Sequence, residues 1–309
     1  MARPLRIEYE GAVYHITSRG DERGAIYGSN RDKEKFLLYL GNAHKRFGVI
    51  IHAYCLMFNH YHLIAETPYA NLSGVMQFLN SSYTTYFNTK RKRSGHLFQG
   101  RYKAILVDKD NYMQELSRYT HLNPVKAKMV KCPEEYEWSS YRYYIKKCTR
   151  PEYLDTDFTL QYFNGNRKRY RKFVEAGMTG GTRDIFKEIK AGFILGDDDF
   201  VEKIKEEHLP SEQKGEDLPE LRKLKKTYID RDMIIKVLEH EEKREKLTAY
   251  YLRKYTDETL QGIVKLVYGE KRSSSGISKI VSRIEKKREE DKEFDAELRG
   301  FENKMSMSR

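Results

Sequence analysis

The hydrophobic pattern of the first part of the chain predicts four β-strands. Residues 11–19 (GAVYHITSR) alternate between two faces, and residues 49–57 and 60–65 are apolar runs separated by a turn-like Phe58-Asn59. Residues 98–107 (FQGRYKAILV) form the fourth run. Short runs of this kind, bounded by turn residues, are typical of strands.

Three longer stretches have apolar residues at helical spacing. They are residues 31–47, residues 71–90 and a segment for which Asp110 is a candidate N-cap. The third helix is expected to stop before Pro124, because proline disfavours helical geometry in the residue that precedes it. The resulting order of strands and helices predicts an α+β fold, in which helices cover one face of an antiparallel, ferredoxin-like sheet.

The remaining chain is predicted to be mainly helical. We divide the protein into an α+β domain at residues 1–145, a helical connecting region at 146–240 and an all-α region at 241–309. Residues 274–287 (SSGISKIVSRIEKK) suit the recognition helix of a helix-turn-helix. Its polar residues, Ser274, Ser275, Ser278, Lys279 and Arg283, would face outward, and Ile277, Ile280, Val281 and Ile284 inward. A plain helical bundle with a solvated basic face is the alternative.

Charge narrows the class of partner. The chain has 58 Lys and Arg against 46 Asp and Glu, a net charge of +12, which favours a polyanion such as DNA or RNA over simple solubility. No apolar run approaches the ~20 residues that span a bilayer, and the N-terminus has no signal-peptide pattern. Three cysteines, an odd count, indicate free thiols. We therefore expect a cytoplasmic, nucleoid-associated protein without membrane contact.

Two short clusters carry candidate chemistry. In a strand, His60 and His62 would point to the same face, and in a helix, Tyr119 and Asn123 would share a face. If that helix packs over the strand, two imidazoles, an amide oxygen and a phenol converge. Imidazole and amide ligands together suit Mn²⁺ or Mg²⁺. Each cluster alone has a plainer explanation, a chance pair of histidines or a buried helix tyrosine.

Three blocks of sequence strengthen the catalytic interpretation. They are residues 54–63 (YCLMFNHYHL), residues 95–103 (GHLFQGRYK) and residues 118–127 (RYTHLNPVKA). In this order they resemble the single-tyrosine HUH transposases, most closely the REP-associated tyrosine transposases, which are relatives of insertion-sequence-200-like enzymes. The resemblance covers roughly residues 5–145, and the C-terminal region is similar to a DnaA-type helix-turn-helix.

The resemblance implies a ferredoxin-like nuclease domain that cleaves and rejoins single-stranded DNA near hairpins. It implies that Tyr119 is the nucleophile and forms a 5′-phosphotyrosine, with His60 and His62 as ligands of Mg²⁺ or Mn²⁺ and Asn123 at the third-ligand position. The chain departs from the family pattern at Tyr61, where an aliphatic residue is usual, and at Phe58, where proline is usual. Neither change removes a catalytic atom, but both permit a domesticated copy.

Other residues are candidates for DNA contact. They are the basic run before the second block, three residues on the fourth strand and the outward face of the recognition helix: Lys90, Arg91, Lys92, Arg93, Gln99, Arg101, Lys103, Ser275, Ser278, Lys279 and Arg283. Tyr83 and Tyr86 are weaker candidate nucleophiles, because no Asn or Gln follows four residues later in a matching block. His15 and His121 receive no role.

Three functions stay open at this point. The first is a metal-dependent transposase or endonuclease acting through Tyr119 on single-stranded or hairpin DNA. The second is a non-catalytic DNA-binding regulator, and the third an RNA-binding or RNA-cleaving protein, which would require the 2′-hydroxyl. A pure binder has no need of all four site residues, so the first is favoured. The sequence leaves open whether the protein is a homodimer.

Overall fold

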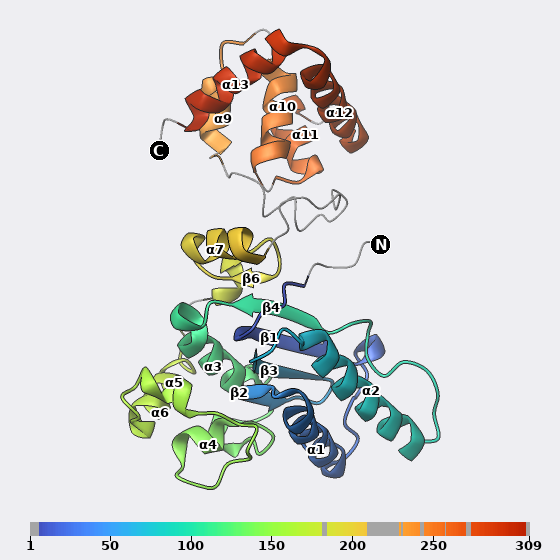
Figure 1. Ribbon diagram of the computed structural model, residues 1–309, viewed down its shortest axis with the longest axis vertical. Helices are drawn as coiled ribbons and strands as arrows, with labels where there is room; N and C mark the ends of the chain where they lie inside the picture. The colour runs from blue at the N-terminus through green and yellow to red at the C-terminus, as the bar shows by residue number, and fades with distance from the viewer. Residues whose placement is uncertain are drawn as a thin grey trace. The chain divides into compact units, whose positions relative to one another are not determined.

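The computed structural model describes residues 6–180, 184–208, 229, 231–241, 244–256, 258–269 and 273–306, apart from the side chains of Ser274, Ser275 and Ser306. The chain divides into two compact units, residues 1–224 and residues 225–309. Figure 1 shows the elements of each unit. In the described residues, no helix is long and apolar enough to cross a membrane.

A six-stranded mixed sheet forms the centre of the first unit. Its strands are β1 (Ala12–Arg19), β2 (Ile50–Leu56), β3 (His60–Thr67), β4 (Lys103–Val107), β5 (Ile189–Lys190) and β6 (Ile194–Leu195). They lie in the order β2-β3-β1-β4-β6-β5. The first four strands pair antiparallel, whereas β6 runs parallel to β4. The α+β class predicted from the sequence is confirmed, and two further strands extend the sheet beyond β4.

Helices cover both faces of the sheet, so the expectation of helices on one face is wrong. The helices α1 (Asn30–Phe47) and α2 (Leu72–Lys90) share a core with one face of the strands, and α3 (Lys109–Lys126) packs on the opposite face (Figure 1). The physical reason is that the strands are apolar on both sides. Tyr14 and Leu63 face α1 and α2, while Val13 and Ile64 face α3.

The helix α3 continues through Pro124 to Lys126, contrary to the predicted stop. Proline lacks the N–H that would bond to the carbonyl of Thr120. The side-chain amide of Asn123 donates to that carbonyl at 3.5 Å and to the Tyr119 carbonyl at 2.9 Å. Because this amide partly replaces the missing donor and Pro124 is buried in the last turn, the helix tolerates it.

The chain after α3 packs back onto it. Short helices α4 (Tyr141–Ile145), α5 (Asp157–Gln161) and α6 (Arg167–Ala176) follow, together with single turns of 3₁₀-helix at Asp21–Arg23, Pro133–Glu135 and Ile185–Glu188. Buried His121 accepts or donates one hydrogen bond to Tyr170 Oη (2.7 Å) and one to Ser140 Oγ (2.9 Å). These contacts anchor α3 to the segment that follows it. After β6, α7 (Asp198–His208) covers β4 and β6 through Val201 and Ile204.

The second unit is helical throughout its described residues. Its helices are α9 (Arg231–Val237), α10 (Arg244–Tyr255), α11 (Leu260–Tyr268), α12 (Ser274–Glu290) and α13 (Lys292–Ser306). Ile277 and Ile280 of α12 are buried, while Ser278, Lys279 and Arg283 are exposed, as the pattern predicted. The side chain of Ser275 lies outside the described residues. The helix-turn-helix assignment itself stays a prediction.

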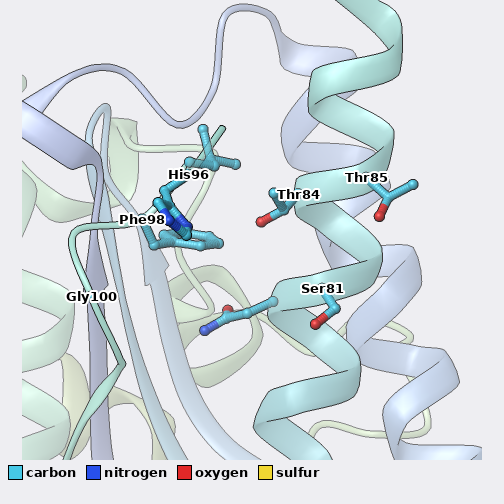
Figure 2. Close-up of a pocket in the computed structure, with 8 residues that line it drawn as sticks. Ser81, Thr84, Thr85, His96, Phe98 and Gly100 are labelled. Atoms are coloured by element: carbon cyan, nitrogen blue, oxygen red, sulfur yellow. The ribbon is translucent and has the colours of Figure 1, made fainter. Parts of the chain in front are cut away.

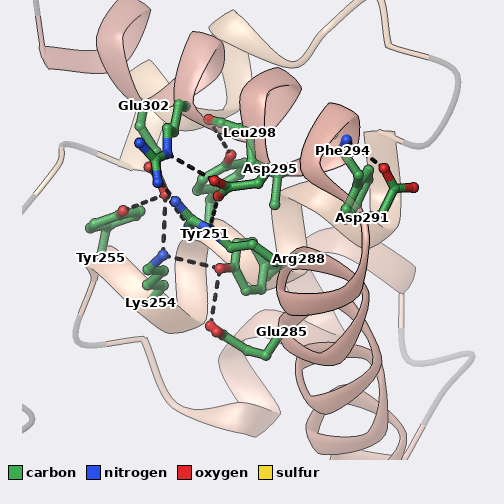
Figure 3. A network of polar contacts seen from close by, with 12 residues as sticks. Tyr251, Lys254, Tyr255, Glu285, Arg288, Asp291, Phe294, Asp295, Leu298 and Glu302 are labelled. Atoms are coloured by element: carbon green, nitrogen blue, oxygen red, sulfur yellow. Dashed lines mark hydrogen bonds and ion pairs between the residues drawn. The ribbon is translucent and has the colours of Figure 1, made fainter.

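A polar network ties α10, α12 and α13 together (Figure 3). Glu302 accepts hydrogen bonds from Arg288 at 2.8 and 3.1 Å, from Tyr255 at 2.7 Å and from Lys254 at 3.1 Å. Arg288 also bonds Asp295 at 2.6 Å. Burial opposes ionisation of Glu302, but these donors outweigh it and lower its pKa to about 2.

Candidate functional site

The two histidines of the HxH pattern lie on one face of β3, as strand alternation requires. Their ring centroids are 5.0 Å apart. In the register with β1, His60 pairs with Arg19, and His62 pairs with Thr17. His62 is 5% exposed and His60 is half-buried. This face is the one that α3 covers, so β3 presents both imidazoles to the helix that carries Tyr119.

Each histidine has one ring nitrogen engaged. His62 Nδ1 lies 3.1 Å from Nε2 of His15, and His60 Nδ1 lies 2.8 Å from Oδ1 of Asn59. His62 Nε2 is buried and has no hydrogen-bond partner among the described residues. A buried polar atom without a partner is costly, and a free Nε2 is the atom that an imidazole offers to a metal.

Electrostatics keeps these imidazoles neutral. Burial, with the charge of Arg19 adding to it, lowers the pKa of His60 to about 4. Burial lowers the pKa of His62 well below its usual value, and the neighbouring His15, His60 and Arg19 act in the same direction. Both rings are therefore unprotonated at neutral pH, which is the form that binds metal.

Tyr119 lies beside His62 and beside a further histidine, His15, on β1. Its ring centroid lies 5.7 Å from that of His62 and 5.9 Å from that of His15, edge-on to both. Burial raises the pKa of Tyr119, and a hydrogen bond with the Asn123 side chain partly offsets this. Lys126 Nζ, on an exposed side chain, lies 5.0 Å from the Tyr119 ring centroid. His60 thus adjoins His62, His62 adjoins Tyr119, and Asn123 contacts Tyr119.

The donor set fits a divalent cation only in part. Within the ranges described above, no three His, Cys, Asp or Glu residues gather into a metal site. Two imidazole nitrogens and the amide oxygen of Asn123 would leave coordination positions for water or a phosphate. The orphaned Nε2 of His62 is the observation that favours such a site, and the ligand assignment stays a prediction.

The predicted DNA contacts differ in their surroundings. Lys90 and Arg91 form ion pairs with the fully buried Asp32, at 2.7 and 2.5 Å, so they hold α2 to α1. Lys92 and Arg93, which follow them, are exposed. Gln99, Arg101 and Lys103 are also exposed. Lys103 on β4 pairs with Thr17 on β1, and Thr17 pairs with His62 on β3. Lys103 therefore lies two strands away from His62, in the same cross-strand register.

An open pocket of about 360 Å³ lies on the opposite face of the sheet, beside α2. Figure 2 shows Ser81, Thr84 and Thr85 of α2 on one side and His96, Phe98 and Gly100 on the other. The hydroxyl groups make this pocket polar. It belongs to the face that packs α1 and α2, and it does not contain the histidines or Tyr119.

Two residues at the candidate site were missed from the sequence. His15 lies on β1 with its ring nearly parallel to that of His62, and Phe186 contacts Tyr119 with ring centroids 4.5 Å apart. His15 shares the face of Val13 and Thr17, so the strand alternation carried a signal for it. Phe186 comes from a segment with no pattern to link it to Tyr119.

Comparisons with known proteins agree with these blocks of sequence. Residues 8–123 match the model of the family described as "Transposase IS200 like". The matched segment contains β1 to β4 and most of α3, with all four residues of the predicted site. Over this segment, the match confirms the resemblance that the three blocks of sequence indicated.

Among solved structures, this chain is similar to that of a REP-associated tyrosine transposase bound to a REP hairpin. It is 16% identical, has a TM-score of 0.41, and the similarity covers 46% of this chain and 84% of that chain. A comparison with curated proteins gave no match.

Proposed function

We propose that the protein is a transposase that cuts and rejoins single-stranded DNA near hairpins through Tyr119. The observation that carries the proposal is the convergence of Tyr119 with His60 and His62 on one face of the sheet, within the segment that matches the transposase family. A family match alone would leave the chemistry open. Two imidazoles beside a phenol, one of them with an Nε2 that has no partner among the described residues, add groups that phosphoryl transfer requires.

The reaction would proceed as a transesterification. The Tyr119 oxygen attacks phosphorus and forms a new O–P bond, while the bond from phosphorus to the 3′-oxygen breaks. The phenol proton is released, and the 3′-oxygen takes up a proton to leave as a hydroxyl. The 5′-phosphotyrosine keeps the energy of the diester, so attack by a 3′-hydroxyl rejoins the strand without ATP.

The residues around Tyr119 have distinct tasks in this scheme. His60, His62 and Asn123 would hold Mg²⁺ or Mn²⁺, which, when bound, supplies a Lewis acid for the phosphate oxygens. Asn123 contacts the Tyr119 side chain and carbonyl, which orients the phenol. The exposed ammonium of Lys126 lies close enough to the ring to meet the incoming phosphate.

The test is formation of a covalent adduct. The protein is incubated with labelled single-stranded hairpin DNA and Mg²⁺ or Mn²⁺, then denatured. We expect a 5′-linked adduct that is absent with Tyr119→Phe and with EDTA. Tyr86→Phe, which removes one of the two alternative nucleophiles on α2, should still form the adduct. Metal-independent binding without an adduct across varied hairpins would overturn the proposal and favour a DNA-binding regulator.

A further inference from the structure

A third histidine lies behind the HxH pair. His15 comes from β1, is 3% exposed, and places Nε2 3.1 Å from Nδ1 of His62. The planes of the two rings differ by only 8°. The contact is a hydrogen bond between two imidazole nitrogens, in which one ring donates and the other accepts.

The role of His62 as a metal ligand would decide which of the two rings donates this hydrogen bond. A neutral imidazole carries one proton, and a nitrogen that ligates a metal must be the unprotonated one. If Nε2 of His62 is the ligand atom, its proton is on Nδ1, and Nδ1 donates to Nε2 of His15. His15 then carries its own proton on Nδ1. A histidine that binds a metal normally has its second nitrogen held in this way.

We infer that His15 is a positioning residue that fixes the tautomer and the ring plane of His62, so that Nε2 of His62 is presented to a divalent cation. The inference rests on the metal site of the proposed function. Nε2 of His15 is used by His62, and Nδ1 of His15 is buried without a hydrogen-bond partner among the described residues. Phe186, whose ring centroid is 5.4 Å from that of His15, closes the space beside it.

Two substitutions separate positioning from packing. His15→Gln can place an amide oxygen near the position of Nε2 and keep an acceptor for His62. His15→Leu keeps an apolar volume and removes the acceptor. His44→Gln is the control, because His44 is a half-buried histidine on α1 that bonds the Val49 carbonyl on the other side of the sheet. The affinity of the full-length variants for Mn²⁺ is measured by titration with MnCl₂, with free Mn²⁺ followed by electron paramagnetic resonance.

We expect His15→Leu to weaken Mn²⁺ binding by about 10- to 100-fold, the usual effect of removing an outer partner of a metal ligand. His15→Gln should recover most of this loss, and His44→Gln should bind as the unchanged protein does. Equal affinity in a folded His15→Leu variant would overturn the inference. So would a wild-type protein whose Mn²⁺ binding is absent or independent of His60.

Nuclear magnetic resonance of the wild-type protein, labelled at histidine nitrogens, tests the same point without relying on a variant that folds. We expect His62 to be protonated on Nδ1, and protonation on Nε2 would refute the inference. The adduct assay distinguishes the two proposals. Mn²⁺ binding that depends on His15 without a Tyr119 adduct would leave the positioning role intact and reject the transposase chemistry.

Discussion

The buried carboxylate of Asp32 tests whether Lys90 and Arg91, at the end of α2, stabilise the fold or bind DNA. Asp32 is fully buried and accepts hydrogen bonds from Lys90, Arg91 and the Gly28 backbone. Burial raises its pKa, but these donors outweigh burial and hold the pKa far below the usual range. We predict that Asp32→Asn destabilises the first unit substantially, because it removes the negative charge that both cations neutralise.

The magnitude follows from the geometry. Removing one partner from a buried ion pair costs about 3–5 kcal/mol when the remaining charge stays buried. The side chains of Lys90 and Arg91 are 35% and 28% exposed, so both can turn toward water, and the lower end applies. A loss of about 3 kcal/mol is a large share of the ~5–15 kcal/mol that folds a typical domain. It corresponds to a decrease in Tm of roughly 6–12 °C for a unit of this size.

The assay is calorimetry and urea unfolding of the full-length protein. The control is Glu34→Gln, which removes a carboxylate from an exposed position on the same helix and should change stability by less than about 0.5 kcal/mol. A loss below about 1 kcal/mol for Asp32→Asn, which is the range of a surface pair, would refute the reasoning. Lys90 and Arg91 would then be available to bind DNA.

Three further predictions concern DNA binding, chemistry and pH. Arg91→Gln should lower Tm. Lys92→Gln should leave Tm unchanged and should reduce the slope of log K against log salt concentration for single-stranded DNA binding by about 0.7, the value expected for one lost phosphate contact. The reverse pattern would contradict a structural role for Arg91 and a DNA-binding role for Lys92. Lys126→Gln should slow adduct formation at saturating DNA about tenfold, equivalent to ~1.4 kcal/mol, with Lys126→Arg restoring the rate; an effect on DNA affinity alone would argue against contact with the reacting phosphate. The pKa of Glu302 is about 2 in the folded protein and 4.5 as a free side chain. Its contribution of up to about 3 kcal/mol to the free energy of unfolding is therefore present above pH 4.5 and is lost as the pH falls toward 2. Urea unfolding of the full chain across this range should show the loss, and Glu302→Gln should remove this pH dependence.

Local patterns predicted the centre of the fold well. The four antiparallel strands and the helices between them begin and end within a few residues of the expected positions, except that β4 starts only at Lys103. The orientation of His60 and His62 toward the helix of Tyr119 was predicted from strand alternation, from helical spacing and from the assumption that this helix packs over the strand. Period-two and period-3.6 patterns are properties of neighbouring residues, so a single sequence contains them.

The errors came from interactions that the periodicity of the sequence does not contain. Both faces of the strands are apolar, and only the packed structure shows that α3 takes one face while α1 and α2 take the other. Pro124 stays helical because the Asn123 side chain supplies a donor, which a rule about proline alone does not consider. Phe186 reaches Tyr119 from a segment whose place in the sheet depends on the pairing of β6 with β4.

The pairing of β6 with β4 also protects the protein from association. Without β5 and β6, β4 would be an edge strand whose unpaired N–H and C=O groups invite another chain to add to the sheet. Leu106 and Val107, which β6 covers, are apolar and buried. A fragment that ends with the transposase-like segment would expose this edge together with Tyr119. We therefore expect such fragments to aggregate, and a fragment designed to keep this sheet intact should extend at least through α7.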